Sequence, residues 1–180
     1  MARMLADKKR TLWILEGKPE DPNAPTAAEI NGGENASCSI GNAGFSIGAS
    51  TPNVENDGSL CEGASAETPT SKTYAASMNI YRFYEPGTKQ IKVEEDFVFQ
   101  AFKEFGSEVW VALRDGGKEH TEEAEEGDEV SIYKLIAGGM GRASDTAGWQ
   151  KREAHVTVAD GFEDKWVGGT PPVAGGGGGG

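Results

Sequence analysis

The sequence predicts a mainly β fold: a β-sandwich or flattened barrel of roughly six to eight strands, with one flanking α-helix, long loops and a flexible glycine-rich C-terminus. Alternation of apolar and polar residues, the period of a half-buried strand, recurs in several segments. Helical periodicity is convincing in a single segment. The 26 glycines and the modest apolar fraction of 37% agree with short elements joined by many turns.

The N-terminal third begins with one apolar strand and continues with little regular structure. Residues 11–16 are apolar and are followed by glycine and proline, which predicts a buried strand. Residues 25–30 are compatible with one helical turn, and residues 36–40 with a weak strand. Residues 41–70 are rich in Gly, Ser, Asn and Pro, so we expect a long loop, and loops of this length in compact domains usually have a function.

Residues 71–85 form the clearest predicted strand. Tyr74, Met78 and Ile80 lie on an apolar face that alternates with small or polar residues. The segment 107–114 has apolar residues on both faces, as an interior strand does. Two more strands are predicted at residues 127–136 and 150–159, followed by a turn at Asp160 and Gly161 and a last short segment around Trp166.

The single convincing helix is predicted at residues 94–105. Its apolar side chains recur with helical spacing and form one stripe: Val98, Ala101, Phe102 and Phe105. Acidic residues fill the first turn, where the helix dipole favours negative charge, and Gly106 is placed to end the helix. We expect the stripe to pack on a sheet.

The chain length fits one domain, predicted at residues 1–167 with an N-terminal arm, and residues 168–180 are predicted to be a disordered glycine-rich tail. No apolar run approaches the ~20 residues of a membrane span. The apolar stretch behind the basic N-terminus is also shorter than the ~7–15 residues of a secretory signal.

Cys38 and Cys61 are expected to be free thiols, although the sequence leaves a disulfide between them open.

The net charge of −12 argues against two classes of partner. An acidic surface repels phosphates, so neither stable nucleic-acid binding through charge nor docking on anionic membranes is expected.

The sequence offers no catalytic constellation, so we expect no enzymatic activity and no cofactor. His120 and His155 are the two histidines, and both are expected at the surface without a partner nucleophile. The acidic run 119–129 lacks the alternating ligands of a calcium loop and is expected to be solvated, without metal. Residues 138–141 are glycine-rich, but no Gly-Lys-Ser/Thr follows, so they are not a phosphate loop.

Several segments, in this order and spacing, resemble the major tail proteins, or tail tube subunits, of long-tailed bacteriophages, especially those of actinobacteria. The likeness extends over about residues 8–159, and no single segment is diagnostic. The segments that carry it are residues 8–17 (KKRTLWILEG), 59–63 (SLCEG), 73–84 (TYAASMNIYRFY), 96–114 and 126–131 (EGDEVS).

The resemblance implies a structural virion protein that forms hexameric rings stacked into a tube, the conduit for ejection of double-stranded DNA. The implied partners are other copies of the chain, the tape-measure protein, the tail terminator and the distal tail proteins. DNA would pass without specific binding, and no membrane contact is implied. The protein would be assembled in the host cytoplasm and would reside in the phage tail.

Under this interpretation, residues 41–59 are the candidate contact between stacked rings. The predicted interface residues are Trp13, Leu15, Phe45, Ile47, Pro52, Asn53, Val54 and Asn56. The acidity either lines the bore and repels DNA or keeps the free subunit soluble, and the lumen-facing residues are not assigned. The alternatives are a monomeric immunoglobulin-like adhesion or decoration module and, less favoured, a small hydrolase.

Overall fold

The structure is a computed structural model that describes residues 8–50, 53–55, 68–142 and 148–172. The strands are β1 (Arg10–Ile14), β2 (Glu34–Asn35), β3 (Ser46–Ala49), β4 (Asn53–Glu55), β5 (Thr68–Ser71), β6 (Tyr74–Tyr81), β7 (Glu108–Asp115), β8 (Glu129–Arg142) and β9 (Lys151–Trp166). The helices are α1 (Ala27–Asn31) and α2 (Phe97–Phe102), with short 3-10 turns η1 (Ser37–Ser39) and η2 (Val167–Gly169).

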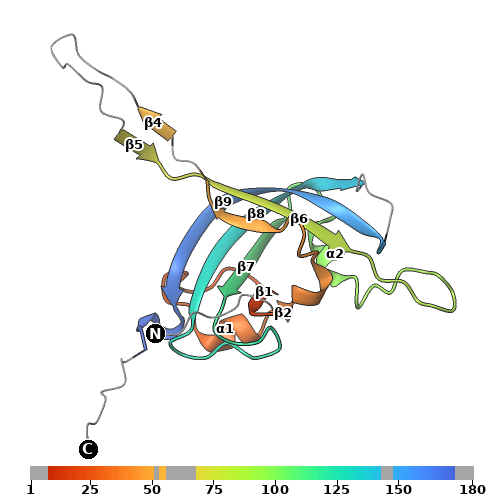
Figure 1. Ribbon diagram of the computed structural model, residues 1–180, viewed down its shortest axis with the longest axis horizontal. Helices are drawn as coiled ribbons and strands as arrows, with labels where there is room; N and C mark the ends of the chain where they lie inside the picture. The colour runs from red at the N-terminus through yellow and green to blue at the C-terminus, as the bar shows by residue number, and fades with distance from the viewer. Residues whose placement is uncertain (1–7, 51–52, 56–67, 143–147, 173–180) are drawn as a thin grey trace, which may run out of the picture.

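Seven strands form one antiparallel sheet in the order β2-β1-β7-β8-β9-β6-β3, and β4 pairs with β5 in a separate ladder. The sheet curves strongly around α2 (Figure 1). Leu12 of β1 and Ile80 of β6, which lie on strands four places apart in the sheet, therefore belong to the same buried cluster. The prediction of a mainly β fold with few helices is confirmed.

The strands β1, β7 and β8 are buried on both faces. Val111 and Leu135 belong to the cluster inside the curve, together with Val98 and Phe102 of α2. A second buried cluster lies on the other face beneath α1 and contains Trp13, Leu15, Ile30, Ala112, Ala124, Val130, Ile132 and Val167. The apolar residues predicted on both faces of segment 107–114 therefore reflect two packed layers.

The predicted weak strand at 36–40 is wrong. The side chain of Asn35 accepts hydrogen bonds from the backbone N–H and the hydroxyl of Ser37, which favours a tight turn over an extended chain. The segment becomes η1 and then reaches Ile40, which forms an isolated bridge to Ile80. The predicted long loop at 41–70 is also partly wrong, because it contains β3, β4 and most of β5.

The helix α2 is shorter than predicted. Val98 and Phe102 are buried, as the stripe requires, but Phe105 is 86% exposed and lies beyond the helix. The chain turns at Gly106, which adopts a positive φ of 82° and donates its N–H to the carbonyl of Ala137. This tie to β8 ends the helical path before Phe105 can face the core.

The predicted turn at Asp160 and Gly161 does not form, because β9 continues through both residues to Trp166. Gly161 serves close packing instead: a Cβ there would lie 2.8 Å from the ring of Tyr74, whose hydroxyl donates to the Gly161 carbonyl over 2.8 Å. The register of β9 against β8 shifts beside this position, as at a β-bulge.

The chain packs beyond the predicted boundary at residue 168. Gly168 donates its N–H to the carbonyl of Pro25, and Pro172 lies against Gly127. The predicted disordered tail therefore does not begin at 168, and residues 173–180 lie outside the described part of the chain. Across the described residues, no helix has the length and hydropathy needed to cross a membrane.

Candidate assembly surfaces

The sheet has two open edges. Among the described residues, β2 pairs with β1 alone and β3 pairs with β6 alone, so each leaves one side of its backbone without a neighbouring described strand. An unpaired edge is a template for strand addition by another chain, and soluble proteins usually cover or close it. The molecule therefore presents two backbone edges that a second copy could complete.

A groove of about 470 Å³ lies between β1 and the segment that leads to β3. It is lined by Arg10 and Phe45, whose guanidinium and ring centroid are 5.5 Å apart, and by Leu12. Cys38 and His120 also line it, and no hydrogen bond joins them in the described structure. The groove thus marks the seam where the curved sheet fails to close on itself.

An arm that contains the antiparallel strands β4 and β5 projects from the sheet (Figure 1). Its root is the β3–β6 pair, which ends at Ala49 opposite Tyr74. Ser50 continues the ladder by donating its N–H to the carbonyl of Thr73, and the β4–β5 pair extends it outward. The described parts of this arm are thus a continuation of two sheet strands, which fixes the direction in which the arm leaves the body.

Glu163 of β9 anchors the root of this arm. Its carboxylate accepts hydrogen bonds from Lys72 Nζ at 2.6 Å, the Ala49 N–H at 2.8 Å and the Tyr133 hydroxyl at 3.1 Å. Burial raises the pKa of Glu163, but the hydrogen bonds from Lys72, Ala49 and Tyr133 outweigh burial and lower it. Burial, followed by the charge of Glu163, raises the pKa of Tyr133, so its hydroxyl remains a donor. One carboxylate therefore joins both strands of the arm to the central sheet.

At the α2 end of the sheet, a buried ion pair holds the connection that follows β6. Arg82 donates from Nε to Asp96 Oδ1 over 2.9 Å and from Nη2 to Oδ2 over 3.0 Å, and both side chains are nearly inaccessible. Asp96 also accepts from the Phe83 N–H and from Gln100, and the Arg82 guanidinium lies 3.6 Å from the ring centroid of Phe99. The long connection 82–96 is therefore closed by a bidentate pair at its base.

At the opposite end, the acidic loop 118–128 folds around Arg114. The guanidinium of Arg114 donates to the backbone carbonyls of Glu119 at 2.9 Å, Glu122 at 2.7 Å and Glu123 at 3.0 Å. Most carboxylates of the loop are exposed, in agreement with the expected solvated run, while the loop carbonyls point inward to one cation.

Arg114 has further partners within the sheet. It donates to the hydroxyl of Thr11 and to Asp128 Oδ2, and its guanidinium carbon lies 5.1 Å from the ring of Trp13. Burial raises the pKa of Asp128, but the N–H of Glu125 and the cations Lys118 and Arg114 lower it further than burial raises it. The Arg114 Nε atom is buried without a hydrogen-bond partner in the described structure.

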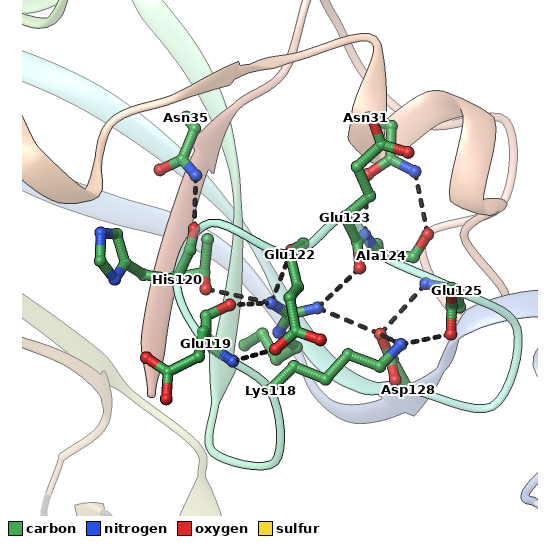
Figure 2. A network of polar contacts seen from close by, with 12 residues as sticks. Asn31, Asn35, Lys118, Glu119, His120, Glu122, Glu123, Ala124, Glu125 and Asp128 are labelled. Atoms are coloured by element: carbon green, nitrogen blue, oxygen red, sulfur yellow. Dashed lines mark hydrogen bonds and ion pairs between the residues drawn. The ribbon is translucent and has the colours of Figure 1, made fainter. Parts of the chain in front are cut away.

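Two asparagines tie the same loop to the N-terminal segments. Asn31 donates to the carbonyl of Ala124 at 2.9 Å and accepts from its N–H at 2.8 Å, and Asn35 donates to the carbonyl of His120 at 2.7 Å. Figure 2 shows these contacts on either side of the loop. The loop is thus fixed to α1, β2 and β7 together.

The structure separates the predicted interface residues. Trp13 and Leu15 are 4% and 7% exposed in the cluster beneath α1, so their side chains are core residues of the subunit. Phe45 and Ile47 are half-buried at the seam and in β3, against the inner cluster. The strand β4 contains Asn53 and Val54, whereas Pro52 and Asn56 lie outside the described residues.

His155 and the glycine-rich segment 138–141 pack against each other and form no catalytic or phosphate-binding arrangement among the described residues. His155 is exposed and lies against Gly138 and Gly141 of β8, where a Cβ would approach within 2.9 Å and 2.7 Å of it. The glycine-rich segment is thus a strand packed closely against its neighbour. Among the described residues, no group of three or more His, Cys, Asp or Glu side chains is positioned to hold a metal ion.

Sequence reasoning missed Arg82, Asp96, Arg114 and Glu163. Arg114 offered one signal, a charged residue at the end of a strand that is apolar on both faces. Asp96 offered another, because it precedes the buried stripe of α2. The partners of both are far away in the sequence or belong to the backbone, so no local spacing pattern identifies them.

Open edges, an anchored projecting arm and a body of one curved antiparallel sheet define a β-rich subunit suited to assembly. The sequence matches the family of phage tail tube proteins over residues 1–168, and the chain belongs to that family. It is therefore a structural protein of the virion tail that self-assembles into a tube with other tail components. No individual curated protein matches the chain.

Proposed function

We propose that the chain forms hexameric rings that stack into the phage tail tube and that the tube conducts double-stranded DNA into the host. The observation that carries the proposal is the pair of open edges at β2 and β3 on one strongly curved sheet. Joining such edges between neighbouring copies would continue the sheet around a ring and remove both free edges. The protein acts through this assembly and has no catalytic role.

The projecting arm is the proposed contact between rings. It leaves the body as an extension of β3 and β6 and is held at its root by Glu163. This refines the predicted stacking loop 41–59: its first part, through Ala49, belongs to the sheet, and the arm beyond it reaches away from the subunit (Figure 1). Phe45 and Ile47 then belong to the seam between neighbours within a ring, and Trp13 and Leu15 to neither contact.

The proposal includes one domain and the other components of the tail as partners. We keep the single domain at residues 1–167 and extend it through the packed segment to Pro172. By its family, the subunit would meet the tape-measure protein inside the tube and the terminator and distal tail proteins at its ends. The family favours this function over an immunoglobulin-like decoration module.

The net charge of −12 suits a conduit for DNA. A basic bore would exchange counterions with phosphates and retain the DNA, whereas acidic residues act as a short-range repulsive surface within about 8 Å at physiological salt. Replacing lumen-facing carboxylates with lysine is expected to leave tubes intact and to slow genome ejection. Unchanged ejection would leave solubility as the role of the acidity.

Negative-stain microscopy of the purified protein tests the assembly. We expect monomers when dilute and regular tubes or stacked rings when concentrated. Hydrogen exchange should then show residues 41–50 better protected in tubes than in monomers, since tube formation pairs the β3 edge. A protein that remains monomeric at every concentration, with the same exchange at 41–50 throughout, would contradict the proposal.

A further inference from the structure

Two arginines stand directly opposite each other at the far tips of β8 and β9. Arg142 pairs with Arg152 across the two strands, so their side chains share one face. Like charges in this position repel each other, and neither arginine forms an ion pair or side-chain hydrogen bond with any described residue. In a chain with 29 Asp and Glu to 17 Lys and Arg, these two neighbouring cations thus have no carboxylate partner among the described residues.

The connection between these strands adds an aromatic residue, Trp149, which is 83% exposed. We call Arg142, Trp149 and Arg152 the tip patch. Arg and Trp are the residue types that most often dominate the binding free energy of protein interfaces. Figure 1 shows the tips of β8 and β9 at the same end of the sheet as α2, after which Phe105 is also exposed. The tip patch therefore has the composition of an interface centre, and its two arginines have no partner in the part of the subunit that the structure describes.

The opposite end of the same strand carries the complementary charge. The acidic loop 118–128 leads directly into β8, and Glu123, Glu126 and Glu129 are exposed there. Within the described residues, their carboxylates have no ion pair or side-chain hydrogen bond, unlike those of Glu119 and Glu125, which bind lysines. Arg114 binds the backbone carbonyls of loop 118–128, and β8 begins at Glu129, so the backbone that carries all three glutamates is ordered.

One subunit cannot join its own two charged ends. β8 has 14 residues, and at about 3.3 Å per residue its ends lie roughly 40 Å apart. A contact between opposite ends of identical molecules is heterologous, and repeating it produces an open polymer. The two ends therefore match each other in the way that head-to-tail stacking requires.

We propose that the tip patch of one subunit binds the carboxylates of loop 118–128 on a subunit of the next ring. The proposal rests on the proposed function and names the surfaces that set the polarity of the tube. Arginine binds carboxylates through paired hydrogen bonds, so the contact fixes orientation as well as adding attraction. It complements the projecting arm, which contributes a separate contact between rings.

Charge reversal on either side tests the contact, with tube formation measured by sedimentation and negative-stain microscopy. Arg142→Glu with Arg152→Glu should raise the concentration needed for assembly at least about tenfold. Glu123→Lys with Glu126→Lys should do the same from the other end. The variant that carries all four substitutions should recover assembly, because both signs are exchanged.

Matched controls separate this contact from general charge effects. Lys18→Glu with Lys89→Glu changes the net charge as much as the arginine pair does, at two exposed lysines outside both charged surfaces, and it should assemble like the wild type. Circular dichroism checks that every variant is folded. The two charge reversals lie at opposite ends of the sheet, so if one of them disturbs folding, the other still tests the contact.

The outcomes are distinguishable from those for the proposed function. If the wild type forms tubes and either charge reversal assembles as well as the control, the tip contact is wrong and the tube function stands. Failure of the fourfold variant to improve on the double variants also overturns the contact. A wild type that forms no tubes at any concentration contradicts the proposed function itself.

Discussion

Arg82 and Arg114 are buried at opposite ends of the same sheet, but they are neutralised in different ways. Arg82 meets a fully buried carboxylate, Asp96, through two parallel hydrogen bonds. Arg114 lies within the most acidic segment of the chain, yet three backbone carbonyls and a hydroxyl supply most of its partners. Its carboxylate partner among the described residues, Asp128, is shared with Lys118.

The difference shows what each end does with its charge. Arg82 and Asp96 are both buried and neutralise each other. The pair therefore stabilises the connection 82–96 and leaves no charge on the surface. Carbonyl binding leaves the side-chain carboxylates of loop 118–128 free, while the loop itself is ordered. Arg82 therefore stabilises the connection 82–96, whereas Arg114 orders the backbone of an exposed acidic loop.

The largest effect should come from breaking the closed pair. Asp96→Asn leaves the Arg82 charge buried without compensation, which should lower the free energy of unfolding by about 3–5 kcal/mol in urea titrations followed by tryptophan fluorescence. Arg82→Met added to Asp96→Asn removes the stranded charge and should recover much of the loss. A single variant as stable as the wild type would mean that the pair contributes little.

The comparison also shows what the sequence could reveal. Alternation identified β6 and the start of β9, because their inner faces are set by local pattern alone. The ends of β8 and β9 were missed, because Gly138 and Gly161 resemble turn residues until His155 and Tyr74 pack against them in the fold. Spacing patterns describe side chains, and so they do not reveal a cation bound by carbonyls or an arm whose ladder is formed by the backbone.

The next effect concerns the shape of the Arg114 side chain. Arg114→Lys keeps the charge, but a single ammonium cannot reach the carbonyls of Glu119, Glu122 and Glu123 together, so the expected loss is about 2–3 kcal/mol. Hydrogen exchange should rise across loop 118–128. As the control, Arg10→Lys alters the exposed pair with Asp115 and should cost less than about 1 kcal/mol. Equal losses in the two variants would show that carbonyl binding is unimportant.

A smaller effect should depend on pH. In the folded state, the pKa of Asp128 lies below its ordinary value of 3.8. Its ionised form therefore stabilises the fold above that pH, and the stabilisation disappears as the pH falls through the lowered pKa. Asp128→Asn should therefore cost about 1–2 kcal/mol at pH 7. Thermal melts of the two proteins should converge on acidification below pH 3.8. If the two proteins still differed in stability below pH 3.8, the loss would come from packing and not from the charge of Asp128.

The smallest effect on folding is expected at the free carboxylates, and this prediction separates folding from assembly most sharply. Glu123→Gln leaves its backbone carbonyl on Arg114 and removes only an exposed charge without an internal partner, so the free energy of unfolding should stay within about 0.5 kcal/mol of the wild type. Tube formation should nevertheless weaken, and added salt should weaken the wild type toward the variant, because the lost attraction is electrostatic. A variant that is destabilised but assembles normally would mean that the loop carboxylates stabilise the fold. The proposed difference between Arg82, which stabilises a connection, and Arg114, which orders an exposed acidic loop, would then be wrong.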